Sequence, residues 1–176
     1  MKPPLHGFAP DDFQTPPEAI TPLLPFLNKR WVIWECAEGK GYLTKALHEH
    51  GYTVIGSDIL TGADFLTWMP EQFDCIVTNP PYSLKHKFLN RCYELGMPFA
   101  LLLPLTTLET RTRQRLFTRH GIEIILFDKR INFHVPSGAE SKSWFATAWF
   151  TWGLDIGKQL TFVSLVETQQ KVMELA

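Results

Sequence analysis

Apolar positions follow two patterns along the chain, short β-branched or aromatic runs and longer segments with helical spacing. The short runs predict strands at residues 31–34, 53–57, 73–78, 99–103, 122–127 and 145–152. The longer segments predict helices at residues 41–50, 83–95 and 107–120. Because strands alternate with helices, the pattern predicts an α/β fold with a doubly wound, mostly parallel sheet.

The two ends of the chain depart from this alternation. Residues 122–127 and 145–152 have no helix between them, so we expect an antiparallel hairpin at the C-terminal edge of the sheet. Residues 153–176 form a C-terminal extension in which residues 160–166 are compatible with one more strand and the tail with a short helix. Residues 1–12 are rich in proline and polar groups and are expected to be a loose arm.

A helix start is predicted just after this arm. Thr15 is a suitable N-cap residue, Pro16 suits the first helical position, and Glu18 completes a capping box. Ser83 is placed in the same way as the cap of the helix that follows residue 82. The chain shows no internal repeat and no linker, so we expect a single domain over residues 1–176.

Composition narrows the class of protein. Hydrophobic residues make up 45% of the 176 residues, which is enough for a core, and no apolar run approaches the length of a membrane span. The N-terminal Met1-Lys2-Pro3-Pro4 is unlike a secretory signal. The three cysteines, Cys36, Cys75 and Cys92, fit neither a disulfide framework nor a metal site. We therefore expect buried free thiols, no bound metal and a cytoplasmic location.

The net charge of −1 counts against a generally basic nucleic-acid-binding protein, but the positive charges are clustered. One cluster contains Lys85, Lys87 and Arg91, and the other runs from Arg111 through Arg115 to Arg119. A basic face on a neutral molecule can still bind a phosphate backbone, and it can equally be an ordinary solvated helix face.

A glycine-containing segment, residues 35–41, links the first strand to a helix and is called the glycine loop below. Gly39 and Gly41 allow a ligand to approach the backbone, while Glu35 and Glu38 would repel a pyrophosphate. An acidic loop favours a cofactor with a cationic end, such as S-adenosylmethionine, and Asp58 at the end of the next strand can accept hydrogen bonds from ribose hydroxyls. A glycine pair alone is weak evidence, so a plain loop stays possible at this point.

The tetrapeptide Asn79-Pro80-Pro81-Tyr82, called the catalytic turn below, follows a predicted central strand. The two prolines stiffen the turn, so that the Asn79 amide oxygen and the Pro80 carbonyl can be directed at one point. Two acceptors of this kind can hold both N–H bonds of a planar amine and stabilise the positive charge that develops during methyl transfer. Tyr82 can stack on a base that has left its duplex.

In these motifs and their order the chain resembles the amino-group methyltransferases of DNA, in particular the small adenine-N6 methylases associated with bacteriophages. The resemblance covers about residues 13–152 and implies a Rossmann-like methyltransferase fold, S-adenosylmethionine as cofactor, DNA as partner and a bacterial or phage-infected cell as the location. It also implies a set of cofactor-binding residues, namely Phe13, Thr15, Pro16, Glu35, Ala37, Gly39, Gly41, Asp58, Ile59, Asp64, Phe65 and Asn79. Within that set, Asp64 would meet the amine of the cofactor adenine and Phe65 its ring.

Nucleic-acid contacts are expected near the catalytic turn and on the second basic cluster. The candidates are Lys85, Lys87, Arg91, Arg111, Arg115 and His134. His134 belongs to residues 130–143, a connection longer than a tight hairpin that can reach substrate or be a plain surface loop.

One departure from the family concerns target recognition. No segment is long enough for the separate recognition region of sequence-specific members, so we expect weak sequence specificity, or recognition shared across a homodimer. Two other functions stay open, an RNA adenine-N6 methyltransferase and a catalytically idle module of the same fold that binds DNA or protein. Release-factor glutamine methyltransferases share the catalytic turn, but the arm before residue 15 is too short for their N-terminal domain.

Overall fold

The structure is a computed structural model, and it describes residues 13–134, 140–141 and 145–165. The loose arm at residues 1–12 and the helix expected in the tail lie outside the described residues. The described strands are β1 (Val32–Glu35), β2 (Thr53–Gly56), β3 (Cys75–Thr78), β4 (Phe99–Pro104), β5 (Glu123–Phe127), β6 (Phe133–His134), β7 (Glu140–Ser141), β8 (Thr147–Trp152) and β9 (Leu160–Val163). The α-helices are α1 (Tyr42–Glu49), α2 (Lys85–Leu95) and α3 (Arg111–His120).

Seven of the described strands form one sheet in the order β2-β1-β3-β4-β8-β5-β9. All neighbouring pairs are parallel except the two that involve β8, which runs antiparallel to both β4 and β5. The doubly wound, mostly parallel prediction is therefore confirmed, including the antiparallel pair near the C-terminal edge. The structure adds that β8 inserts between β4 and β5, and that β9 is the edge strand.

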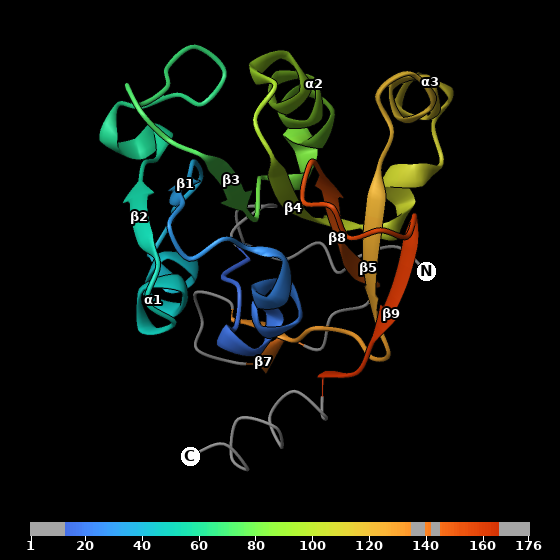
Figure 1. Ribbon diagram of the computed structural model, residues 1–176, viewed down its shortest axis with the longest axis horizontal. Coiled ribbons are helices and arrows are strands. Elements are labelled where there is room, and N and C mark those ends of the chain that lie inside the picture. Colours follow the sequence, from blue (N-terminus) through green and yellow to red (C-terminus); the bar gives the residue numbers. More distant parts are fainter. Residues whose placement is uncertain (1–12, 135–139, 142–144, 166–176) are drawn as a thin grey trace.

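Helices cover both faces of this sheet (Figure 1). One core packs α1 and the N-terminal segment against buried side chains such as Ile33, Val77 and Trp149. The other core packs α2 and α3 against Trp34, Phe99 and other residues that point to the opposite face. Strands β3 and β4 are fully buried along their length, as expected for central strands of a doubly wound sheet.

The N-terminal helix prediction is wrong in form. Residues 17–26 make two short 3-10 helices, Pro17–Ala19 and Thr21–Phe26, because Pro22 and Pro25 lack the amide hydrogens that an α-helix needs. The N-cap residue is Pro16 rather than Thr15, and no side-chain capping hydrogen bond forms at this helix start. Ser83 is likewise not the cap of α2, since it lies inside a 3-10 turn, Tyr82–Leu84, that precedes the helix.

The parallel strands end at one edge of the sheet, and the predicted motifs gather there. β1 leads into the glycine loop, β2 into Asp58, and β3 into the catalytic turn. Because β1 pairs with both β2 and β3, these three segments leave from neighbouring strands. This edge is therefore the expected position of a ligand site in such a sheet.

Three further findings concern the described residues. The cysteines are free and buried, as predicted. No described helix has the length and apolar character required to cross a membrane. No group of three or more potential metal-ligating side chains occurs in the described part of the chain.

Candidate active site

The glycine loop is held against the end of β2 by backbone hydrogen bonds. The Ser57 N–H donates to the Glu35 carbonyl over 2.9 Å, and the Glu38 N–H donates to the Ser57 carbonyl over 3.0 Å. The Gly39 N–H donates to the Asp58 carboxylate over 3.0 Å. The glycine loop and Asp58, the residue predicted to bind the ribose, therefore form one rigid unit.

Two positions in this loop require glycine. Gly39 and Gly41 have φ values of 53° and 77°, in the left-handed region. A Cβ atom on Gly39 would also lie 3.0 Å from the Gln14 side-chain nitrogen. The Gln14 amide oxygen in turn accepts a hydrogen bond of 3.2 Å from the Lys40 N–H, so the N-terminal segment packs directly on the loop.

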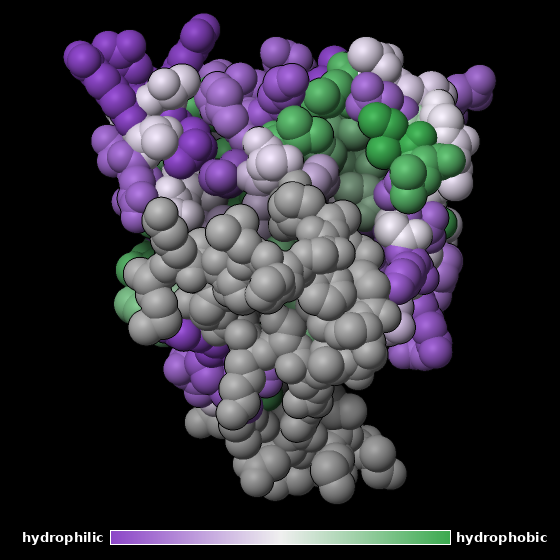
Figure 2. Space-filling model, turned by 180° about the vertical axis from the view of Figure 1, so that it is seen from behind, coloured by the Kyte–Doolittle hydropathy of each residue, from purple (hydrophilic) through white to green (hydrophobic). Residues whose placement is uncertain are grey.

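Asp58 begins a short 3-10 helix, Ile59–Thr61, and its carboxylate also accepts a hydrogen bond from the Leu60 N–H. Exposed apolar side chains gather in this part of the chain: Ile59 is 65% exposed and Leu60 89%. Apolar surface covers the segment after β2 in the space-filling view (Figure 2). A carboxylate beside an uncovered apolar surface suits a ligand that joins a ribose to a flat base.

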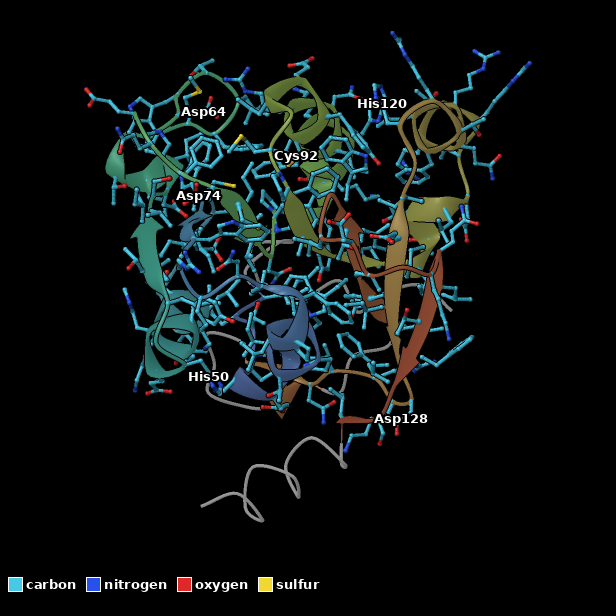
Figure 3. The ribbon with its side chains drawn as sticks, in the orientation of Figure 1. His50, Asp64, Asp74, Cys92, His120 and Asp128 are labelled. Atoms are coloured by element: carbon cyan, nitrogen blue, oxygen red, sulfur yellow. The ribbon has the colours of Figure 1, made fainter. Side chains whose placement is uncertain are left out.

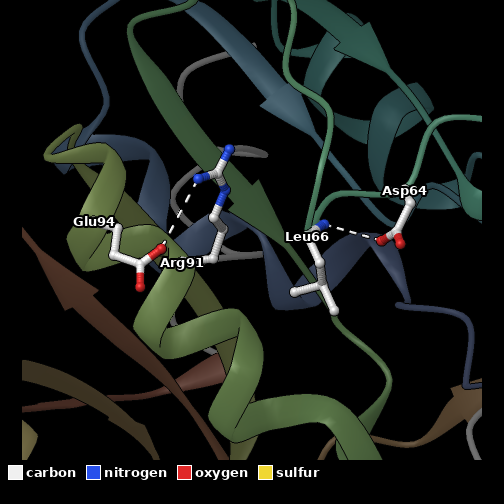
Figure 4. Close-up of polar contacts among 4 residues, drawn as sticks. All are labelled: Asp64, Leu66, Arg91 and Glu94. Carbon is white, nitrogen blue, oxygen red and sulfur yellow. Dashed lines mark hydrogen bonds and ion pairs between the residues drawn. The ribbon is translucent and has the colours of Figure 1, made fainter.

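Asp64 and Phe65, predicted to meet the cofactor adenine, are placed differently from one another. The half-buried Asp64 carboxylate accepts a 2.9 Å hydrogen bond from the Leu66 N–H (Figure 4). Phe65 is only 2% exposed, and its ring stacks on Phe88 with centroids 4.6 Å apart. In this structure Phe65 is therefore a core residue beneath the edge, and only Asp64 of the pair reaches the surface.

The Asn79 side chain has one satisfied end and one unsatisfied end. Its Nδ2 donates a 2.7 Å hydrogen bond to the backbone carbonyl of Phe13. Its Oδ1 is buried and accepts no hydrogen bond from any described residue. A buried acceptor without a donor is costly, so this atom marks a place where a ligand donor would be stabilised. A carbonyl oxygen can accept a hydrogen bond from the amide nitrogen of Asn79 and not from its oxygen. The Phe13 carbonyl therefore also determines that Oδ1 is the end of the Asn79 amide that faces the site.

Phe13 and Gln14 connect the two halves of the site. Phe13 supplies the carbonyl that orients Asn79, and Gln14 bonds the glycine loop through Lys40. The next two residues, Thr15 and Pro16, are buried, which anchors this segment. The N-terminal segment therefore contacts both the glycine loop and the catalytic turn.

Four aromatic rings pack around the catalytic turn. The rings of Phe13 and Tyr82 stack with centroids 5.9 Å apart and an angle of 23°. Phe145 meets Tyr82 edge-on at 5.7 Å, and Phe133 meets it at 6.5 Å. Phe133 and Phe145 belong to described parts of the connection between β5 and β8, and these two residues therefore lie against the catalytic turn. The surroundings of Tyr82 are thus apolar and aromatic, which suits a planar ring.

Glu35 lies under the glycine loop rather than on its surface. It is 1% exposed, and burial raises the pKa of its carboxyl to about 8, with the Glu38 and Asp58 charges adding to the increase. Its Oε1 accepts hydrogen bonds from the Ala37 N–H, over 3.0 Å, and from the Thr78 hydroxyl. Since Thr78 precedes Asn79, one buried oxygen joins the glycine loop to the catalytic turn. Glu35 is therefore a buried residue that connects the glycine loop to the catalytic turn. Glu38 is the loop carboxylate nearer the surface.

The basic residues near the turn are not equivalent. The Lys85 ammonium donates to the Tyr82 carbonyl over 2.9 Å, and the Arg91 guanidinium pairs with Glu94 at 3.9 Å (Figure 4). Both therefore have internal partners, whereas Lys87 is exposed on α2. Arg111 and Arg115 are also exposed, on α3. His134 is the last residue of β6, and its side chain lies outside the described part.

Sequence reasoning missed four residues of the site. These are Gln14, Thr78, Phe133 and Phe145. Thr78 directly precedes the catalytic turn, and Gln14 lies between the predicted site residues Phe13 and Thr15. Their positions in the sequence could therefore have indicated a role in the site. Phe133 and Phe145 are distant in sequence from the turn, and only the pairing of β8 with β4 and β5 brings their segment to it.

Comparison with known proteins supports the fold. No protein-family model and no curated protein matches the chain by sequence. Among solved structures, the chain is similar to the methyltransferase subunit of the type I restriction-modification system from Streptococcus thermophilus, with 17% identity and a TM-score of 0.59. That match covers 89% of this chain and 48% of the other, so the chain spans about half the length of its neighbour.

A second neighbour has the same kind of description. It is a chain from Vibrio vulnificus YJ016, assigned as a modification subunit of a type I restriction enzyme, with 13% identity and a TM-score of 0.52. The match covers 80% of this chain and 44% of that chain. At these identities the similarity establishes the fold, a Rossmann-like methyltransferase sheet.

Proposed function

We propose that this protein is an S-adenosylmethionine-dependent methyltransferase that methylates N6 of adenine in DNA with weak sequence specificity. The observation that carries the proposal is the buried Asn79 Oδ1, which accepts no hydrogen bond from the described residues and belongs to a proline-stiffened turn next to an aromatic ring. The methyltransferase fold and the glycine loop support the same function, because a cofactor bound at this loop would lie beside the catalytic turn, whose strand β3 pairs with β1.

The residues at the strand ends fit the cofactor. Asp58 would hold the ribose, the exposed Ile59 would cover one face of the adenine, and Asp64 would accept from its amine. Gly39 and Gly41 leave the backbone open beside the cationic methionine end, near the Glu38 carboxylate. When bound, S-adenosylmethionine supplies an electrophilic methyl group to the nucleophile that the catalytic turn holds.

The catalytic turn would activate the target amine. The lone pair of an adenine amino group is delocalised into the ring and is a poor nucleophile. Asn79 Oδ1 and the Pro80 carbonyl accept its two N–H bonds, which favours a tetrahedral nitrogen and stabilises the positive charge that develops on it. The Tyr82 ring holds the plane of the base and offsets part of the cost of removing it from the duplex.

DNA is proposed over RNA because the N-terminal Phe13 to Pro16 segment resembles the DNA family and lies on the catalytic turn in this structure. The type I restriction-modification subunits that share the fold point the same way.

Product analysis tests the proposal. The protein is incubated with labelled S-adenosylmethionine and unmethylated DNA, with RNA in a parallel reaction, and each polymer is digested to nucleosides for mass spectrometry. We expect labelled N6-methyladenine from DNA at sites with little shared sequence. Label in RNA alone would favour an RNA methyltransferase, and label in neither polymer would contradict the proposal.

A further inference from the structure

Helix α3 presents a row of arginines with no partner in the described structure. Arg111, Arg115 and Arg119 are four residues apart, so they share one face of the helix. All three are exposed, and none donates a hydrogen bond or forms an ion pair with a described residue. With Gln114 and Thr118 they line a shallow depression of about 320 Å³. Side chains with nitrogen tips project from α3 away from the sheet (Figure 3).

A fourth arginine of the helix shows the contrast. The Arg113 guanidinium donates to the carbonyls of Thr107 and Thr106, at 2.5 Å and 3.2 Å, and so fastens the start of α3 to the preceding 3-10 helix, Leu105–Leu108. Phe117 points into the core. Arg113 therefore has a structural role, and the three outer arginines have none that the described residues reveal.

The chemistry of this face fits a polyanion with regularly spaced charges. α3 contains no acidic residue, so nothing on the helix neutralises the three guanidiniums. Its exposed residues are all polar, whereas a helix that binds a lipid surface needs an apolar face. Arginines eight residues apart span about 12 Å, which corresponds to roughly three or four phosphates along one strand of a nucleic acid.

Topology connects this row to the catalytic turn. α3 is the crossover between β4 and β5, and it begins where β4 has left the sheet. β4 is the neighbour of β3, which carries the catalytic turn, and the two strands are parallel. The Arg111 end of the row therefore lies at the catalytic edge, and the Arg119 end lies further back along the molecule.

We propose that Arg111, Arg115 and Arg119 form the main phosphate-binding surface and guide a nucleic-acid strand toward the catalytic turn. This inference rests on the proposed function and extends it from the methylated base to the backbone that carries it. It also distinguishes these residues from Lys85 and Arg91, whose positive groups are already engaged within the protein.

The test compares two variants with the same loss of charge. One combines R111Q, R115Q and R119Q, and the control combines R30Q, K45Q and K158Q, which remove exposed charges from other parts of the described surface. Binding to a fluorescent DNA duplex is measured over a series of salt concentrations. Thermal melting and affinity for S-adenosylhomocysteine, the demethylated cofactor product, are measured on both variants and are expected to be unchanged.

We expect the α3 variant to lower the slope of log affinity against log salt by about 2 to 3, since each neutralised phosphate contributes about 0.9. The control should keep most of the wild-type slope. An α3 variant with the wild-type slope, or an equal loss in the control, would overturn the proposed surface. So would α3-dependent binding to vesicles of anionic lipid with no binding to DNA.

Failure of the surface and failure of the proposed function give different results. Wild-type protein that methylates DNA, together with an α3 variant that binds DNA normally, would overturn only the surface. Wild-type protein that shows the α3-dependent slope but methylates no polymer would support the surface and overturn the methyltransferase activity.

Discussion

The Asn79 side-chain amide donates a 2.7 Å hydrogen bond to the backbone carbonyl of Phe13, 66 residues earlier in the chain. This contact fixes the orientation of the amide and leaves its buried Oδ1 without a donor among the described residues. The same N-terminal segment contacts the glycine loop through Gln14. The proposed acceptor of the substrate amine is thus positioned by a segment that also contacts the proposed cofactor site.

Replacing Thr78 by valine should slow methyl transfer. The valine side chain fits the buried strand position but removes the hydroxyl that bonds Glu35 and leaves that carboxyl with one fewer partner. We expect a stability loss of about 1 to 2 kcal/mol by chemical denaturation. We also expect a lower kcat with little change in cofactor affinity, because Asn79 is displaced.

Two further variants separate this effect from general destabilisation. Thr147 is also buried, and its hydroxyl has no partner in the described structure, so T147V should be neutral or stabilising and should leave kcat unchanged. T78S keeps the hydroxyl and should restore the rate. A T78V variant with wild-type kcat would show that the Glu35 contact does not position the turn.

The stability of the protein should decrease as the pH rises, because the buried Glu35 carboxyl then loses its proton. Burial raises the pKa of this carboxyl to about 8 from the model-peptide value of 4.5, so the folded state holds the proton more tightly than the unfolded state. The contribution of this proton to stability is complete below about pH 4.5 and is lost as the pH rises toward 8. The E35Q variant has no ionisable group at position 35. Chemical denaturation over this pH range should therefore show no such loss of stability in E35Q.

The comparison between wild type and E35Q isolates that single group. Between about pH 4.5 and pH 8, the difference in unfolding free energy between wild type and E35Q should shift in favour of E35Q by roughly 3 to 5 kcal/mol. A difference that is constant with pH would mean that Glu35 ionises normally in the folded protein.

Substitution of Gly39 by alanine should weaken cofactor binding. A left-handed φ costs an alanine about 1 kcal/mol, and the new methyl group would press on the Gln14 side chain. Gly51 offers a matched control, because it has a φ of 79° and nothing within 4 Å of an added Cβ. Calorimetry with S-adenosylhomocysteine should show reduced affinity for G39A and unchanged affinity for G51A, with similar losses of stability. Equal affinities would contradict the assigned role of the loop.

The sequence predicted the sheet and the motifs at its edge because both depend on local patterns. The buried runs at β3 and β4 and the glycines of the loop are local features, and they identify parallel strands and their connections. One local prediction was wrong. The expected first α-helix is replaced by short 3-10 helices, because Pro22 and Pro25 lack the amide hydrogens that an α-helix needs.

The rest depends on tertiary contacts that no local pattern reveals. The burial of Glu35 and Phe65, two residues predicted to bind the cofactor, follows from how the glycine loop and α2 pack over the sheet, and no local pattern indicates it. The ring contacts of Phe133 and Phe145 with Tyr82 depend on the insertion of β8 between β4 and β5. Likewise, only the structure separates the engaged Lys85 and Arg91 from the free arginines of α3.

The central claim is that Asn79 Oδ1 accepts an N–H bond of the adenine amine during methyl transfer, and single-turnover kinetics with DNA test it most directly. Wild type is compared with N79A and with N90A, which removes a half-buried asparagine whose side-chain amide contacts His86 on α2. We predict that N79A lowers the rate of N6-methyladenine formation about 100-fold or more, while its affinity for S-adenosylhomocysteine falls far less and N90A behaves as wild type. N6-methyladenine formed by N79A at the wild-type rate would contradict the account.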